Sequence, residues 1–176
     1  MIPGIVIAIA TFPGVIVHEA AHLLFCRLRR VPVFEVCYFR FGNPVGYVAH
    51  EAVKDFNTAF LISVGPFLIN SLLCILICFP AFIPIRLYNL SDPLAYVLLW
   101  LGISVGMHAF PSTGDAQNLW HEAKQAAKRL HPLAILSFPL VVLIYIANIG
   151  SIFWLDYAYV FAIGLGLPEL ALKKLL

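Results

Sequence analysis

Long apolar runs separated by short polar segments constrain the fold of this chain more than any other feature. The runs cover residues 2–26, 57–79, 94–110 and 132–167. About 20 apolar residues are enough to cross the hydrocarbon core of a bilayer. Hydrophobic residues make up 62% of the chain and charged residues only 11%, whereas soluble domains are about a quarter charged. The sequence therefore predicts an integral membrane protein.

The last apolar run, residues 132–167, is longer than the roughly 17–25 residues of a single transmembrane helix. Asn148-Ile149-Gly150-Ser151 divides it into two short spans. We therefore predict an α-helical membrane protein with about five transmembrane helices in one domain. Residues 1–131 would form a core of three spans, and residues 132–176 would add the last two.

The segments between the runs have their own patterns. Residues 33–41 are rich in β-branched and aromatic residues, Gly42-Asn43-Pro44 is a turn signal, and residues 45–48 resume the extended pattern. This pattern predicts a small membrane-associated β-hairpin across residues 33–49. Residues 115–130 are polar and predict a cytoplasmic amphipathic helix.

Prolines predict where the spans bend or end. Pro13-Gly14 predicts a kink in the first span. Pro80, Pro84 and Asp92-Pro93 predict a loop after the second span, and Pro111 predicts the end of the third.

The basic residues indicate an orientation. With the N-terminus outside, ten of the eleven basic residues fall on the cytoplasmic side and only Arg86 falls outside. Such a bias follows the positive-inside rule and favours an odd number of spans, because Lys173 and Lys174 would also be cytoplasmic. The net charge of +2 is too small to suggest a nucleic-acid partner. The lipid bilayer is the partner that the composition indicates.

The first span contains the motif His18-Glu19-x-x-His22. Two histidines four residues apart share one face of a helix and can bind one zinc ion, while the adjacent glutamate can act as a general base. Ionisable side chains within a span are costly and mark functional sites. Two other interpretations remain: the histidines could hydrogen-bond to neighbouring helices, or the metal site could be non-catalytic.

A catalytic zinc ion needs a third protein ligand. The candidates are His50, Glu51, His108, Asp115, His121 and Glu122. Depth favours Asp115, because His18 and His22 lie about 7–14 Å inside the cytoplasmic edge. Asp115 follows Pro111-Ser112-Thr113-Gly114, where we expect a broken backbone at a similar depth.

The other candidates have alternative roles. Asp115 could instead be the N-cap of the helix that follows it. His108 could orient a ligand without binding the metal, and His50 and Glu51 are reserve ligands. We expect His121 and Glu122 to be exposed on the polar helix.

Asn70 is a lone amide in the second apolar run, downstream of Gly65-Pro66. A buried amide needs a hydrogen-bond partner. It could join two helices, or it could donate to the substrate carbonyl or its oxyanion.

Together these features resemble the site-2 protease family of intramembrane zinc metalloproteases. The resemblance extends from the first span to about residue 120 and follows the family's order: the His-Glu-x-x-His span, the hairpin, the Gly65-Pro66 span with Asn70, and the segment ending in Asp115. One departure is that Gly114 precedes the aspartate, whereas the family commonly has Leu-Asp-Gly. The chain therefore resembles a divergent, minimal member.

The resemblance implies an intramembrane zinc endopeptidase that cleaves transmembrane or membrane-proximal segments of a protein substrate near the cytoplasmic face. His18, His22 and Asp115 would bind one zinc ion, and Glu19 would be the catalytic base. The hairpin edge could pair with an unwound substrate. The alternative is a non-proteolytic membrane protein that binds a metal or a partner helix on the same scaffold.

Overall fold

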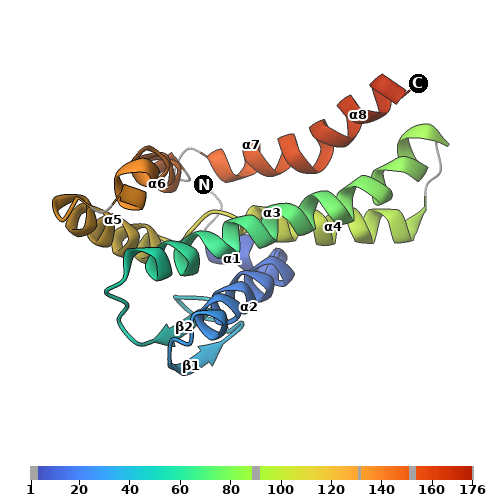
Figure 1. Cartoon of the computed structure of the whole chain (residues 1–176). Coiled ribbons are helices and arrows are strands. Elements are labelled where there is room, and N and C mark those ends of the chain that lie inside the picture. Colours follow the sequence, from blue (N-terminus) through green and yellow to red (C-terminus); the bar gives the residue numbers. More distant parts are fainter. Residues whose placement is uncertain (1–3, 89–91, 131, 151–153, 176) are drawn as a thin grey trace.

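A computed structural model describes residues 4–88, 92–130, 132–150 and 154–175. It is mostly helical, with one small two-stranded antiparallel sheet (Figure 1). The helices are α1 (Gly4–Ala10), α2 (Phe12–Leu28), α3 (Phe56–Leu87), α4 (Pro93–Met107), α5 (Thr113–Lys128), α6 (Pro132–Gly150), α7 (Leu155–Phe161) and α8 (Leu167–Leu175), with a π-helical segment, η2 (Ala162–Gly166), before α8. The predicted class, helical with a hairpin after the first apolar run, is confirmed.

The long helix α3 organises the bundle (Figure 1). Its 32 residues extend about 48 Å at 1.5 Å per residue. Helix α4 runs antiparallel along its C-terminal half, where Gly102 meets Cys78 and Gly106 meets Cys74. Helix α5 packs against its N-terminal half through Leu119. Helices α4 and α5 therefore pack one after the other along α3. The break between them, at residues 108–112, lies near the middle of α3.

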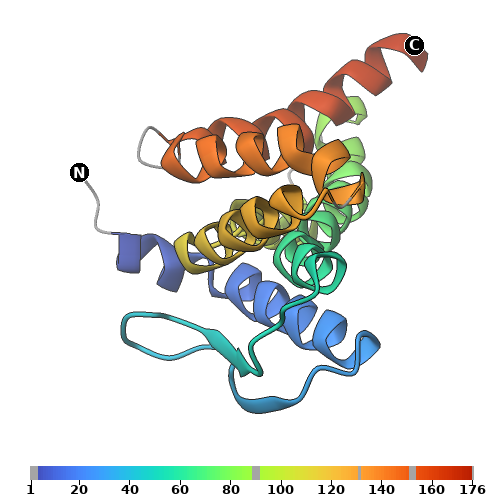
Figure 2. The same ribbon diagram turned by 60° about the vertical axis from the view of Figure 1, so that its left-hand side comes forward.

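The hairpin and helices α6–α8 lie on opposite sides of α3, as both views show (Figures 1 and 2). Helix α6 packs on α5, where the Trp120 and Tyr145 rings stack at 5.2 Å. Helix α7 contacts α3 through a 2.7 Å hydrogen bond between the hydroxyls of Tyr159 and Ser71.

The first apolar run is sharply bent. Helices α1 and α2 meet at 87°, and the break falls at Thr11, whose backbone N–H and hydroxyl both donate to the Ile7 carbonyl. Pro13 then occupies the first turn of α2, where its missing N–H removes no helical hydrogen bond. The kink predicted at Pro13-Gly14 is therefore present, slightly earlier than expected.

Gly14 allows α2 to approach α4 closely. A Cβ atom there would lie 1.9 Å from the Ser104 carbonyl oxygen. We predict that Gly14→Ala lowers the unfolding free energy by about 1–3 kcal/mol, since overpacking displaces both helices. Thermal unfolding in detergent measures the effect. Gly4→Ala is the control, because its Cβ would meet nothing within 4 Å; equal stability of the two variants would contradict the prediction.

The predicted hairpin is present with shorter strands. Strand β1 (Val33–Cys37) pairs antiparallel with β2 (Tyr47–His50), with Val36 opposite Val48. Their connection covers residues 38–46 rather than a tight turn at 42–44. The reason is that Phe39 leaves the ladder and packs against Phe12 of α2, with ring centroids 5.8 Å apart.

Two predicted helix ends are wrong. Helix α3 does not stop at Pro80 but continues through Pro80 and Pro84 to Leu87. A proline removes only one backbone donor, and apolar spans tolerate this better than soluble helices do. The third run was expected to remain helical to residue 110, but α4 ends at Met107 because Pro111 disfavours helix before it.

Two helical segments among the described residues are long and apolar enough to cross a membrane: α3 and the continuous stretch Leu155–Lys174. The bent pair α1–α2 would add a third. Helix α4 and the Ala134–Ile146 part of α6 are apolar but shorter. The predicted division at 148–151 falls partly outside the described residues, since α6 continues to Gly150 and residues 151–153 are not described.

Ion pairs join the C-terminal helix to the end of α3. Arg86 of α3 donates two hydrogen bonds, of 2.9 and 3.0 Å, to the Glu169 carboxylate of α8. Lys173 lies 3.3 Å from the same carboxylate. Arg86 and Lys173 are therefore at the same end of the bundle, although charge counting placed them on opposite sides. The reason is that α6 folds back on α5, so that α7–α8 alone runs to the far end of α3.

Candidate metal centre

The His18-Glu19-x-x-His22 motif lies on α2, on the face that packs into the bundle. His18, Glu19 and His22 are all buried, with exposed fractions of 7%, 8% and 6%. The two imidazole rings are 4.8 Å apart, as expected for residues one helical turn apart.

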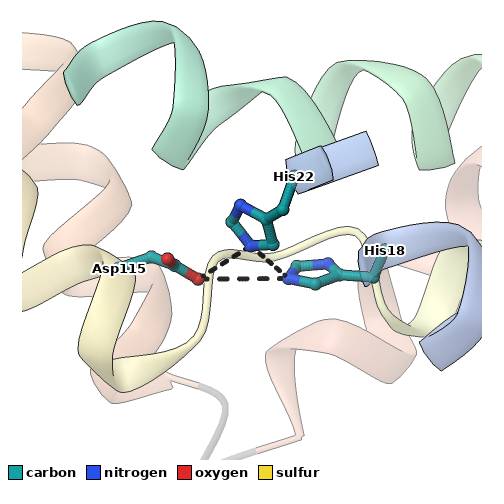
Figure 3. A group of neighbouring side chains, drawn as sticks. All are labelled: His18, His22 and Asp115. Carbon is teal, nitrogen blue, oxygen red and sulfur yellow. Dashed lines mark hydrogen bonds and ion pairs between the residues drawn. The ribbon is translucent and has the colours of Figure 1, made fainter. Parts of the chain in front are cut away.

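Asp115 meets the two histidines from the first turn of α5 (Figure 3). His22 Nε2 lies 3.1 Å from His18 Nε2 and 3.2 Å from Asp115 Oδ2. His18 Nε2 lies 4.0 Å from the same oxygen. Of the candidates for a third ligand, Asp115 is the one that the described residues bring together with both histidines.

The donor set fits a metal ion. Ligand atoms at about 2.0–2.1 Å from a tetrahedral zinc ion are about 3.3 Å apart. Two of the three separations, 3.1 and 3.2 Å, are close to this value, and the third, 4.0 Å, is longer. Two imidazole nitrogens and a carboxylate oxygen can therefore hold one metal ion.

A backbone group holds the His18 imidazole ring. His18 Nδ1 donates a 2.7 Å hydrogen bond to the His108 carbonyl, which leaves Nε2 free to act as a ligand. His22 Nε2 faces His18 Nε2 and Asp115 Oδ2. Hydrogen bonds of this kind fix the orientation of histidines that bind metals.

His108 supports the site with its main chain rather than its ring. Its carbonyl accepts from His18, while its Nε2 lies 2.8 Å from the Thr11 hydroxyl at the bend of α2. The expected supporting role of His108 therefore has a structural basis. The group that contacts His18 is the backbone carbonyl of His108, whereas the sequence had suggested its imidazole ring.

Asp115 is also part of the helix start. Ser112, not Asp115, is the N-cap of α5, and the two residues form a reciprocal capping box. Asp115 Oδ2 accepts from the Ser112 backbone N–H at 3.1 Å and from its hydroxyl at 2.6 Å. Burial would raise the pKa of the Asp115 carboxyl, but hydrogen bonds from His22 and Ser112 outweigh it and lower the pKa to about 2.

Two cavities of about 360 and 520 Å³ adjoin the three residues. Both are lined by Glu19, Gly46, Ser112 and Thr113. The hairpin connection packs closely against Glu19, since a Cβ atom at Gly46 would lie 2.8 Å from Glu19 Cγ. Glu19 therefore has a small exposed fraction, but it lines both cavities.

Asn70 is fully buried and lines neither cavity. Its amide nitrogen lies within hydrogen-bonding distance of three main-chain carbonyls, those of Gly14, Val105 and His108. Of the two predicted roles, the bond between helices is the one that these contacts support. Contact with a substrate oxyanion would require an exposed amide.

The remaining candidates lie apart from the convergent group. His50 lines the 520 Å³ cavity, and its Nδ1 lies 2.8 Å from the Glu51 carbonyl oxygen. His121 is exposed and lies beside Gln125 on α5, as expected. Glu122 is partly exposed on the same helix.

Two residues near the site were missed in the sequence. Ser112 holds Asp115, and the Ser-x-x-Asp spacing of a capping box was the available signal. Asp156 of α7 lines the 360 Å³ cavity together with His18 and Glu19. It is the only charged residue in the apolar run 132–167, and an isolated charge of this kind indicates function.

Comparisons of the chain with protein-family models, curated proteins and solved structures found no match.

Proposed function

We propose that this protein is an intramembrane zinc endopeptidase of the site-2 protease type. The observation that carries the proposal is the convergence of His18, His22 and Asp115, with Glu19 on both adjoining cavities. The bundle around them contains helices long and apolar enough to cross a membrane. A site built only for structure would not need a carboxylate facing the cavities beside the ligands.

Zinc is the metal that suits these donors. Two histidines and one carboxylate are a common catalytic zinc set, which leaves one coordination position for water or substrate. When bound, zinc acidifies water and polarises the carbonyl of a peptide bond.

Glu19 supplies the acid–base chemistry. Its carboxylate would accept the proton of the attacking water and then transfer it to the amine that leaves the cut peptide bond. Its place between the two cavities supports this role, since both water and substrate must reach it.

The substrate would be a membrane-embedded peptide segment. A helix hides its peptide bonds in its own hydrogen bonds, so the segment must unwind before cleavage. The 520 Å³ cavity lies between strand β2, at Tyr47 and Val48, and the start of α5. An unwound segment there could pair with the strand, as extended peptides do at sheet edges.

The proposed topology places the N-terminus outside and the site toward the cytoplasmic face. Because Arg86 and Lys173 share one end, α6 and α7–α8 together contribute one net crossing. With α1–α2, α3 and α4, the chain would cross four times rather than five. The basic bias remains, since eight of the eleven basic residues stay cytoplasmic.

This topology predicts an external C-terminus. A reporter enzyme that is active only outside the cytoplasm should be active when fused after residue 176. The control is the same reporter fused after Arg129, at the cytoplasmic end of α5, where it should be inactive. The reverse pattern would contradict the four-crossing arrangement.

The proposal is tested by comparing membrane-protein fragments in cells that express the wild-type chain or Glu19→Gln. A fragment formed only with the wild type supports proteolysis. A non-proteolytic metal-binding protein is the second candidate, because Asp115 has a structural role in the capping box as well. Bound zinc without any wild-type-dependent fragment would favour it.

A further inference from the structure

The buried amide of Asn70 reaches the main chain at the point where α2, α3 and the break after α4 meet. We infer that Asn70 is a positioning residue for the metal ligand His18, acting through the backbone carbonyl of His108. This inference rests on the proposed metal centre and concerns how its geometry is held.

The contacts form a continuous chain. Asn70 Nδ2 donates at 3.0 Å to the His108 carbonyl oxygen, and His18 Nδ1 donates at 2.7 Å to the same oxygen. A carbonyl oxygen has two lone pairs and can accept both. Asn70 also donates to the Val105 carbonyl at 3.0 Å and lies 3.4 Å from the Gly14 carbonyl.

The break in the backbone makes this support necessary. The last carbonyls of a helix have no intrahelical partner, and α4 ends at Met107, just before His108. Without a donor, the His108 peptide group could rotate. Asn70 is fully buried, so water cannot replace its amide. The amide therefore fixes the direction of the carbonyl.

The direction of that carbonyl decides how His18 binds metal. While Nδ1 donates to it, the neutral ring presents the lone pair of Nε2 toward His22 and Asp115. A rotated carbonyl would let the ring turn or change tautomer. Loss of such supporting hydrogen bonds typically lowers metal affinity by about 10–100-fold. Since Asn70 acts one bond further out, we expect the lower end of that range.

The test compares Asn70→Leu, which has a similar size and no donor, with the wild-type protein in detergent. We expect the zinc dissociation constant, measured by chelator competition, to rise about 10-fold. The visible absorption spectrum of the cobalt-loaded protein should also change, because the orientation of one imidazole ligand changes. Asn70→Asp, which keeps the volume, should weaken zinc binding similarly.

Ser71→Ala is the matched control. It removes the neighbouring interhelical hydrogen bond of α3, to Tyr159, without touching His108. It should lower thermal stability but leave zinc affinity and the cobalt spectrum unchanged. Wild-type affinity in a folded Asn70 variant would overturn the inference, and so would failure of both Asn70 variants to fold, because a positioning role predicts folded protein with a weakened site.

Neither readout requires proteolysis. A wild-type protein that binds zinc but cuts no substrate would refute the proposed activity and leave this inference standing. Unchanged zinc affinity in Asn70→Leu, together with normal proteolysis, would refute this inference and leave the proposed activity standing. A wild-type protein that binds no zinc would refute both.

Discussion

Glu19→Gln is expected to lower the rate of proteolysis by about 10²–10⁴-fold, the usual contribution of general acid–base catalysis. The amide keeps the size of the side chain but cannot accept the water proton. Zinc content should remain at the wild-type value, since Glu19 does not belong to the convergent group of ligands. The rate is measured on single-span peptides in proteoliposomes, with fragments identified by mass spectrometry.

Glu169→Gln is a matched control for this substitution. Glu169 lies on α8, accepts hydrogen bonds from Arg86 and lines neither of the cavities that Glu19 lines. Its replacement should leave the rate of proteolysis within about 10-fold of the wild-type rate. Proteolysis by Glu19→Gln at the wild-type rate would remove the basis of the proposed mechanism.

Asp115→Asn is expected to reduce zinc affinity by more than about 100-fold, beyond the range found for residues that only support a ligand. Asparagine keeps an oxygen for the capping contacts with Ser112 but loses the negative charge that zinc requires. Chelator competition measures the change, and circular dichroism shows that α5 remains folded.

Ser112→Ala separates the two roles of Asp115. Losing the N-cap should cost about 1 kcal/mol of stability while the carboxylate stays available for metal. Zinc binding by Asp115→Asn as tight as in the wild type would show that Asp115 serves only the capping box, and the second candidate function would then be preferred.

Local spacing explains which parts of the site could be predicted from the sequence. His18 and His22 share a face because of the helical period alone, and the hairpin follows from strand-forming residues around a turn signal. Asp115 could be selected because Pro111 and Gly114 indicate a broken backbone at the right depth. Each of these inferences depends on residues close together in the chain.

Long-range contacts explain what could not be predicted. The acceptors of Asn70 lie on segments 35, 38 and 56 residues away, and one is a backbone carbonyl that carries no side-chain signal. The pairing of Arg86 with Glu169 spans 83 residues and depends on α6 folding back onto α5. Charge counting treats each loop separately, so it could not foresee that Arg86 and Lys173 contact the same carboxylate.

Pro80 shows a different failure. In a soluble protein it would end a helix, but in an apolar helix an open backbone would cost more than the single missing donor. Helix α3 therefore continues through Pro80 and Pro84 to Leu87.

Zinc K-edge X-ray absorption of the protein purified from membranes tests the proposed metal centre most directly. One zinc ion per chain with two imidazole ligands, light-atom scatterers at about 2.0–2.2 Å and no sulfur is the predicted result. A protein without zinc, or a zinc ion bound by cysteine sulfur, would contradict the account.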